Sequence, residues 1–299
     1  MGLFHRLRGW LNRLYAHPFN RERPVTALVR LVRWHTLRLS GRARDLEFWG
    51  TRTIRCYPDA DGSMWLILNV VMDWNEFHFM RRYLRANDTF LDVGANLGIY
   101  TLWASQFVDT LSGHGRIVAV EPDPKNLSRL HEQLALNGLD RVKIAPVALS
   151  ASAGTIRFSQ GNDGLNHIIL AEPTSEGYIK VPAITLDSYC AENNIALVSF
   201  LKIDVEGAEQ LVLAGGRQML AERRIDVIQL EFNEQVYNRG LSDSAVMALL
   251  EGYGYSLYRF DAAASTLTIV PRIDLLSHEN LFAIHDVSQV RRRLAEGAS

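Results

Sequence analysis

From residue 87 onward, short apolar runs alternate with longer stretches in which apolar residues recur every three or four positions. Short apolar runs between turn residues predict buried strands, and the wider spacing predicts amphipathic helices. Regular alternation of the two predicts an α/β fold whose mostly parallel sheet is covered by helices on both faces. The seven expected strands lie near 89–93, 116–120, 142–147, 199–204, 226–232, 254–260 and 279–285, and the expected helices lie near 98–110, 124–137, 207–221 and 242–252.

The first 86 residues follow two other patterns. Apolar side chains at helical spacing predict an amphipathic helical arm over residues 1–45, with its second helical stretch around 28–39. Residues 46–86 predict a small strand-rich lead-in that includes the apolar run 64–72 and ends with a helix around 76–84. We therefore expect four parts along the chain: the arm 1–45, the lead-in 46–86, an α/β domain 87–287 and a C-terminal tail 288–299.

Charge is distributed unevenly along the chain. The net charge is −1, which gives no reason to expect a nucleic-acid partner. Residues 1–44 contain ten arginines and a single acid, Glu22, which leaves 22 basic and 32 acidic residues and a net charge of −10 for the rest. We interpret the arginine-rich arm as an appendage folded onto the body or as an oligomer contact. The alternative is that residues 1–20 lie on an anionic membrane surface.

Composition limits the compartment and the kinds of ligand. With 47% hydrophobic and 22% charged residues, the chain resembles an ordinary globular protein. No apolar run is long enough to cross a bilayer, and no signal-peptide pattern is present. The two cysteines allow at most one disulfide and have no metal-ligand spacing, so we expect a cytoplasmic protein.

The most informative motif is the segment 90–101, in which a short apolar strand turns through glycines directly into a helix. Such a turn holds a nucleotide-like ligand at the carboxyl edge of a doubly wound sheet. Gly94 has no Cβ, so a ligand can approach the backbone, and Gly98 lets the new helix pack against the sheet. The polar Asp92 and Asn96 suit a zwitterionic amino-acid tail better than a diphosphate. The motif therefore favours S-adenosylmethionine over the cofactor of a nicotinamide-dependent oxidoreductase.

A second acid stands at the end of the next apolar strand. Glu121 lies 27 residues after Gly94, near the interval at which a strand–helix–strand unit presents a carboxylate to a ribose. One carboxylate can accept hydrogen bonds from both ribose hydroxyls. The simpler alternative is that Asp92 and Glu121 only cap helices, as acids near helix N-termini often do.

Five separated segments, in the same order, are similar to motifs of the FkbM-type S-adenosylmethionine-dependent methyltransferases. The resemblance covers roughly residues 70–285, and 200–209 is its longest family-specific segment. It implies a doubly wound, Rossmann-like class I methyltransferase sheet and methyl transfer to a hydroxyl of a saccharide, a glycan or a secondary metabolite. The segments are 92–98, 120–122, 147–150, 184–187 and 200–209.

The motifs and the resemblance together predict a set of cofactor-binding residues. The segment 147–150 is similar to the part of the family's sequence that borders the adenine. The predicted contacts to S-adenosyl-L-methionine are Asp92, Gly94, Ala95, Asn96, Gly98, Thr101, Glu121, Ala148 and Asp204.

Carboxylates at strand ends are the first candidates for a catalytic base. An alcohol is a poor nucleophile while it is protonated, so a base that removes its proton is needed. Asp204 and Glu206 follow an expected core strand, at the edge where ligands bind in such sheets. Crowding with Glu209 would raise the pKa of at least one of these acids, whereas pairing with Lys202 would lower it. Equally, Asp204 could hold the cofactor's ammonium group and Glu206 could interact with a helix dipole.

Other interpretations of this region stay open. His167 is the second candidate base because imidazole titrates near neutrality. Asp204, Glu206 and Glu231 could instead hold a divalent cation, although we rank metal-free transfer higher and predict no metal. A cofactor-binding scaffold without activity is the non-enzymatic alternative, and the arm leaves an oligomer open.

Overall fold

The structure, a computed structural model, divides the chain into two compact units, Met1–Trp74 and Asn75–Ser299. The domain boundaries expected from the sequence stay predictions. None of the helices in the described part of the chain is long and apolar enough to cross a membrane. The structure describes residues 18–21, 24–69, 73–159, 168, 178–232, 243–270 and 279–297.

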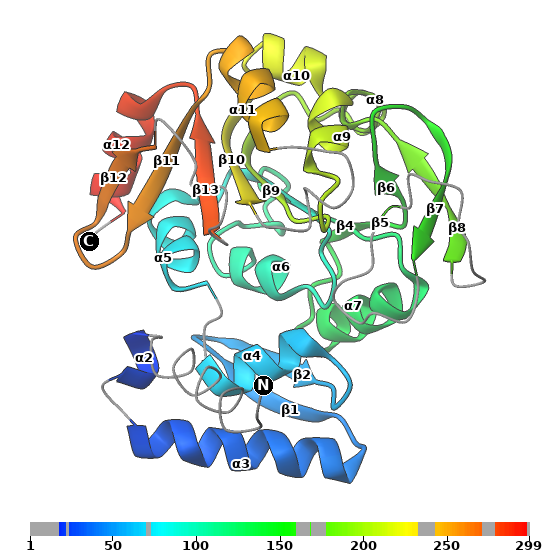
Figure 1. Ribbon diagram of the computed structural model, residues 1–299, viewed down its shortest axis with the longest axis vertical. Coiled ribbons are helices and arrows are strands. Elements are labelled where there is room, and N and C mark those ends of the chain that lie inside the picture. The colour runs from blue at the N-terminus through cyan, green and yellow to red at the C-terminus, as the bar shows by residue number, and fades with distance from the viewer. Residues whose placement is uncertain are drawn as a thin grey trace, which may run out of the picture. The chain divides into compact units, whose positions relative to one another are not determined.

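The first unit combines helices with one β-hairpin (Figure 1). Its elements are α2 (Pro18–Arg21), α3 (Pro24–Ser40), β1 (Arg44–Phe48), β2 (Arg52–Cys56) and α4 (Asp61–Asn69). β1 and β2 pair in antiparallel fashion, and α3 packs against α4. The predicted helical stretch at 28–39 is confirmed as part of α3, whereas residues 1–17 of the arm lie outside the described residues.

One prediction for this unit is wrong. The predicted strand-rich lead-in includes the apolar run 64–72, but the described part of this run belongs to α4. A short apolar run does not distinguish a buried strand from a buried helix by periodicity alone. Asp61 in the first turn of α4 favours the helix because a carboxylate there interacts well with the helix dipole.

The second unit is built on an eight-stranded sheet with the order β12-β11-β13-β10-β9-β3-β4-β5. The five strands from β10 to β5 are parallel, and β13, β11 and β12 each pair in antiparallel fashion with their neighbours. The strands are β3 (Thr89–Val93), β4 (Arg116–Val120), β5 (Lys143–Ala145), β9 (Val198–Ile203), β10 (Ile225–Phe232), β11 (Ser256–Asp261), β12 (Thr266–Ile269) and β13 (Glu279–Ile284).

This order confirms the α/β, doubly wound sheet expected from the sequence. The chain runs outward from β3 through β4 to β5 and then returns to the other side of β3 with β9 and β10. All seven expected strands are present, and β12 is an eighth that the pattern missed. A separate sheet of β6 (Ala148–Leu149), β8 (Tyr178–Ile184) and β7 (Gly154–Ser159) was also not predicted.

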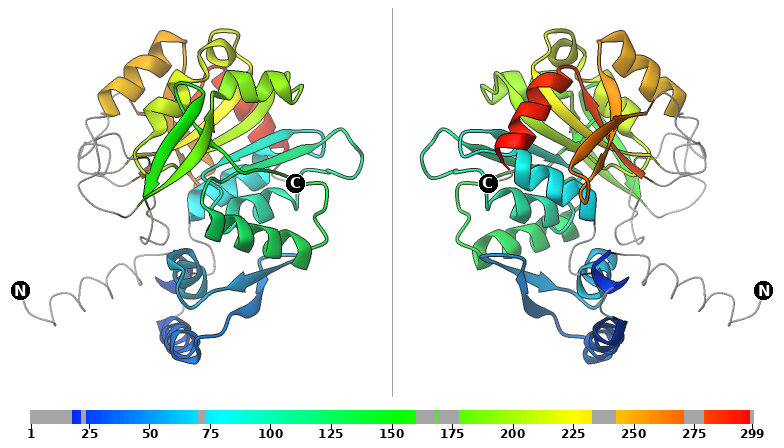
Figure 2. Two further views of the ribbon diagram at one scale, coloured as in Figure 1. Left: turned by 90° about the vertical axis from the view of Figure 1, so that its right-hand side faces the viewer. Right: turned by 90° about the vertical axis from the view of Figure 1, so that its left-hand side faces the viewer.

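Helices cover both faces of the large sheet, as expected; α11 and α12, for example, lie on opposite sides (Figure 2). The helices are α5 (Trp74–Tyr83), α6 (Ile99–Ala104), α7 (Pro124–Leu136), α8 (Leu186–Glu192), α9 (Glu209–Ala214), α10 (Arg217–Ala221), α11 (Asp243–Gly252) and α12 (Val287–Glu296).

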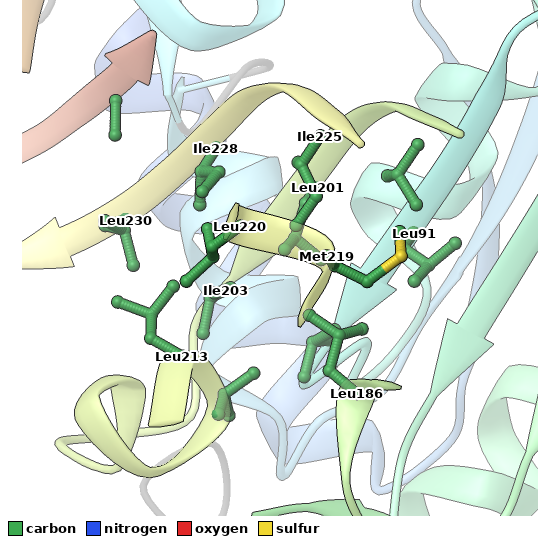
Figure 3. Packing of buried hydrophobic residues seen from close by; sticks show 14 of the residues in the cluster. Leu91, Leu186, Leu201, Ile203, Leu213, Met219, Leu220, Ile225, Ile228 and Leu230 are labelled. Carbon is green, nitrogen blue, oxygen red and sulfur yellow. The ribbon is translucent and has the colours of Figure 1, made fainter. Parts of the chain in front are cut away.

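Successive side chains of a strand point to opposite faces of the large sheet, and the cores on the two faces differ in composition. On one face, strand residues such as Leu91, Leu201 and Ile228 pack with Met219 and Leu220 of α10 (Figure 3). On the other face, aromatic rings dominate. Phe79 of α5 stacks on Phe282 with ring centroids 4.2 Å apart and lies 5.8 Å from Phe200. Since side chains two residues apart share a face, the polar strand positions 92, 202 and 229 lie on this aromatic side.

Two helix predictions need correction. The helix expected at 98–110 ends at Ala104, and the helix expected at 207–221 is two helices, α9 and α10. Gly215 stands at the break, where a Cβ would lie 2.2 Å from the backbone oxygen of Ser150. Part of the segment expected as a C-terminal tail is α12, whose N-cap Asp286 accepts a hydrogen bond from Gln289 N.

Candidate active site

The site forms where the winding of the sheet reverses, between the carboxyl ends of β3 and β9. Asp204 N donates to Val93 O at 3.0 Å, which draws the two chains together just beyond the strands. Gly94 has φ +78°, and a Cβ there would lie 1.9 Å from the backbone oxygen of Asp204. Gly94 is therefore required by a neighbouring backbone, a reason different from the ligand approach predicted from the sequence. Ligands bind at such reversal points in open α/β sheets.

The turn after β3 is fixed by its backbone hydrogen bonds. The N–H groups of Gly94 and Ala95 both donate to Val120 O at 3.0 Å. Asn96 follows with φ 49° and Gly98 with φ +80°. A Cβ on Gly98 would lie 2.5 Å from a methyl carbon of Leu130 in α7. Gly98 thus brings α6 close to α7, whereas the sequence predicted a contact with the sheet.

Glu121 is buried and ties this turn to β4. Its Oε2 accepts from Asn96 N and its Oε1 accepts from Asp123 N, both at 2.8 Å. Burial raises the pKa of Glu121 to about 7, although these two N–H groups act in the opposite direction. Each carboxylate oxygen has two lone pairs, so Glu121 keeps acceptor capacity for ribose hydroxyls.

The capping alternative for the two acids is wrong. Helix α7 is capped by Asp123, whose side chain accepts from Lys125 N and Asn126 N. The N-cap position of α6 is Gly98, without a side-chain cap. Neither Asp92 nor Glu121 is therefore an N-cap residue of α6 or α7.

A buried polar row lies beneath the turn, close to the carboxyl ends of β3, β9 and β10. The register pairs Asp92 with Lys202 and Lys202 with Gln229. The Lys202 ammonium lies 3.5 Å from Asp92 Oδ1 and 3.1 Å from Asp204 Oδ2, and it stands 4.6 Å from the centre of the Tyr100 ring. The Lys202 ammonium therefore pairs both with the fully buried Asp92 and with Asp204 at the end of β9.

Two further polar contacts complete this row. Thr101 Oγ1 donates to Asp92 Oδ2 at 2.7 Å, and Gln229 Nε2 donates to Tyr100 Oη at 2.9 Å. Burial raises the pKa of Asp92, and the charge of Lys202 opposes the rise. The sequence does not predict Tyr100 or Gln229 as site residues, and it predicts Lys202 only as a possible partner of the acids. The usable signal was a polar residue within an otherwise apolar strand, at 202 and at 229.

Three carboxylates gather at the ends of β9 and β10. One oxygen each of Asp204, Glu206 and Glu231 lies within 4.8 Å of the others, and all three residues are half-buried. Within the described ranges, these acids form the group of potential ligands that is close enough to hold a cation. Glu206 has φ 54°, an unusual conformation for a residue with a Cβ. The structure therefore brings together the acids that the sequence predicts as candidate bases or cation ligands.

Glu209 shapes the loop that carries Glu206. It is buried at the start of α9, and its Oε1 accepts from Val205 N and Gly207 N, both at 3.2 Å. Burial raises the pKa of Glu209 to about 7, and the charge of Asp204 adds to the rise. The predicted upward shift among the crowded acids is thus found at Glu209, whose contacts make it part of the loop's framework.

One predicted site residue lies in the small sheet. Ala148 pairs with Ala183 and shares an apolar cluster with Ala208, next to the loop of Glu206. His167 lies outside the described residues.

The donor set fits S-adenosylmethionine. Carboxylates at the end of β9 suit an ammonium group, and the spare lone pairs of Glu121 suit a ribose. The buried Asp92 Oδ1 makes no hydrogen bond and faces Lys202 at ion-pair distance. The walls of the site are therefore polar and mostly anionic, as a cationic sulfonium cofactor requires.

Comparisons with known proteins agree with this geometry. The model of the methyltransferase FkbM domain matches residues 92–257. The 2-O-methyltransferase NoeI of Sinorhizobium fredii (strain NBRC 101917 / NGR234) is 30% identical over 180 residues, 54% of this chain and 71% of NoeI. The 31-O-demethyl-FK506 methyltransferase FkbM of Streptomyces tacrolimicus is 28% identical over 204 residues, 58% and 75% of the two chains.

Solved structures are more distant. A SAM-dependent O-methyltransferase from Thermotoga maritima aligns with 70% of this chain and 63% of its own, at 12% identity and a TM-score of 0.39, too low to support an argument. The family match covers more than half of the chain, and it decides against the nicotinamide-dependent oxidoreductase and the inactive scaffold. The chain belongs to the FkbM methyltransferase family and is an S-adenosylmethionine-dependent methyltransferase with a class I sheet.

Proposed function

We propose that the protein transfers a methyl group to a hydroxyl of a saccharide, a glycan or a small secondary metabolite. The names of both relatives specify an oxygen as the methylated atom. The observation that carries the proposal is the trio of Asp204, Glu206 and Glu231, whose carboxylate oxygens meet beside the Gly94 turn. A hydroxyl acceptor needs a base, and this edge of the sheet supplies three.

The cofactor, when bound, supplies an electrophilic methyl group on a sulfonium. The protein must hold the acceptor oxygen in line with that methyl group and take up the hydroxyl proton. Glu206 is our choice as the base. Asp204 is held by Lys202 at 3.1 Å, so we assign Asp204 to the ammonium end of the cofactor. Glu231 stands beside Glu206 as a second acceptor of the proton or of an acceptor hydroxyl.

The cofactor-binding assignment divides the predicted set into residues that border the cofactor and residues that shape the turn. We propose that the turn of Gly94, Ala95 and Asn96 borders the aminoacyl part and that Glu121 binds the ribose. Ala148 borders the adenine in this proposal. Asp92, Thr101 and Gly98 act through the shape of the turn, because Asp92 contacts Lys202 and Thr101, and a Cβ at Gly98 would meet Leu130. His167 remains the alternative base.

The test combines acceptor profiling with a matched pair of variants. Purified protein is incubated with methyl-labelled S-adenosylmethionine and a panel of mono- and oligosaccharides, and NMR identifies the methylated atom. In Glu206→Gln, we expect unchanged affinity for S-adenosylhomocysteine and turnover lowered by about 100-fold or more. The control is Glu192→Gln, an exposed acid at the end of α8, which should leave both unchanged.

Two results would overturn the proposal. Methyl transfer only to nitrogen acceptors would exclude the hydroxyl assignment. Wild-type turnover in Glu206→Gln would exclude Glu206 as the base and direct attention to His167 or Glu231.

A further inference from the structure

Helix α3 has apolar side chains on two opposite faces. One face is buried through Ala27, Trp34 and Leu37, and α3 packs against α4. In the first unit, α4, β1 and β2 all lie on one side of α3 (Figure 1). The residues of the opposite face, here called the α3 stripe, are between 51% and 88% exposed: Val25, Leu28, Val29, Val32 and Leu39.

Helical geometry makes the α3 stripe continuous. At about 100° per residue, its five side chains fall within roughly 100° of the helix circumference. Five large apolar side chains on one exposed helix face exceed the scattered apolar residues of an ordinary surface. The stripe therefore has the form of a docking surface.

Basic groups border the stripe. Helix α3 contains three arginines, Arg30, Arg33 and Arg38, and no Asp or Glu. The same angular spacing places Arg33 along one border and His35 along the other. Arg33 and Arg38 are exposed, and so is Arg44 just beyond the helix. The surface thus combines an apolar centre with a positive rim.

A groove of about 440 Å³ lies on the hairpin side of α3, between α3 and the hairpin. Arg33 both borders the stripe and lines this groove. Guanidinium groups above an apolar floor fit a phosphate headgroup joined to an acyl chain. The lining includes the arginines Arg30, Arg33 and Arg44, the carboxylate Glu47, and the apolar Leu37 and Phe48.

The charges around the α3 stripe distinguish between two binding partners, a second copy of the chain and an anionic membrane. If a second copy of the chain docked through a two-fold interface, the same positive rim would face itself. Helix α3 has no acid with which those arginines could pair. An anionic lipid surface, in contrast, can bury the stripe at its acyl boundary and can pair its phosphates with the basic groups of the rim.

We propose that α3 lies along an anionic membrane surface, with the α3 stripe in the acyl boundary and the exposed groove arginines Arg33 and Arg44 at lipid phosphates. The helix has 17 residues, or about 26 Å, and it lies on the surface instead of crossing the bilayer. This surface is separate from the candidate active site, so its test does not depend on the proposed function.

The experiment is co-sedimentation of the full chain with vesicles. Vesicles of phosphatidylglycerol and phosphatidylcholine in equal amounts are compared with phosphatidylcholine alone. We expect binding to the anionic vesicles that weakens between about 0.1 M and about 1 M salt. The triple variant Leu28→Gln, Val32→Gln and Leu39→Gln should bind about 100-fold more weakly. Its matched control changes three exposed apolar residues elsewhere, Leu111→Gln, Leu197→Gln and Ile269→Gln, and should bind like the wild type.

A second variant tests the positive rim. Arg33→Gln with Arg44→Gln should weaken binding to anionic vesicles by about 30-fold, since each arginine near such a surface contributes about fivefold. All substituted side chains are exposed, so the variants should fold, which circular dichroism checks.

Three results would overturn the proposal. They are equal binding to neutral and anionic vesicles, wild-type binding by the triple variant, and absence of binding together with a stripe-dependent dimer in light scattering. The last result would assign the stripe to a second copy of the chain.

Discussion

Replacing Gly94 by alanine tests the geometry on which the site depends. Gly94 has φ +78°, and its Cβ would stand 1.9 Å from the backbone oxygen of Asp204. Ordinary contact requires a separation larger by roughly 1.5 Å, so β3 and β9 would have to move apart just beyond their ends. That movement would lengthen the hydrogen bond from Asp204 N to Val93 O, which is 3.0 Å long.

The expected cost has two parts. A left-handed φ costs alanine about 1–2 kcal/mol, and the forced separation with a weakened backbone hydrogen bond adds about 2–3 kcal/mol. We therefore expect Gly94→Ala to lower the free energy of unfolding by about 4 kcal/mol. A displacement of about 1 Å at the site should also weaken S-adenosylhomocysteine binding by about 100-fold.

A second glycine provides the control. Gly113 has φ +79°, almost the same as Gly94, but a Cβ there would meet nothing within 4 Å. Gly113→Ala should therefore lower the free energy of unfolding by only about 1–2 kcal/mol and leave binding unchanged. Urea denaturation measures the stabilities, and isothermal titration calorimetry measures the affinities.

The comparison between the two variants can refute the reasoning. Equal losses of stability would mean that the Asp204 backbone does not constrain Gly94. Unchanged affinity in a folded Gly94→Ala variant would separate the turn from the cofactor site.

Three further experiments test the buried charges and whether turnover depends on a metal ion. Lys202→Met should destabilise the protein by about 3–5 kcal/mol, and by more at about pH 8 than at about pH 5, because it leaves Asp92 buried without its cation; an equal loss at both pH values would contradict this. Glu121 and Glu209 have pKa values of about 7 against 4.5, so the folded state keeps protons that the unfolded state has lost. The free energy of unfolding should therefore fall as the pH rises from 4.5 to about 7, by up to about 3 kcal/mol for each group, and urea titrations that show a rise would disagree. Turnover should be the same with and without EDTA, whereas a loss restored by Mg²⁺ or Mn²⁺ would favour a cation at Asp204, Glu206 and Glu231.

The parallel strands and the acidic edge could be predicted from the sequence because each depends on local patterns. Largely apolar segments specify strands such as β4, β9 and β10, and acids at or just after their carboxyl ends lie at one edge in any parallel sheet. That rule alone predicts that Asp204, Glu206 and Glu231 lie together, as the structure shows.

Features that depend on distant contacts could not be predicted in this way. The need for glycine at 94 comes from the backbone of Asp204, which is 110 positions away in the chain. The role of Lys202 depends on its register with Asp92 and Gln229 across three strands. The run 64–72 shows the limit of periodicity, because an apolar helix and an apolar strand have the same composition.

A crystal structure with S-adenosylhomocysteine tests the central claim most directly. We expect the ligand between the Gly94 turn and the end of β9, with its ribose at Glu121 and its amino group at Asp204. Ligand bound at another place in the chain, or an empty site under conditions in which calorimetry shows saturation, would contradict the account.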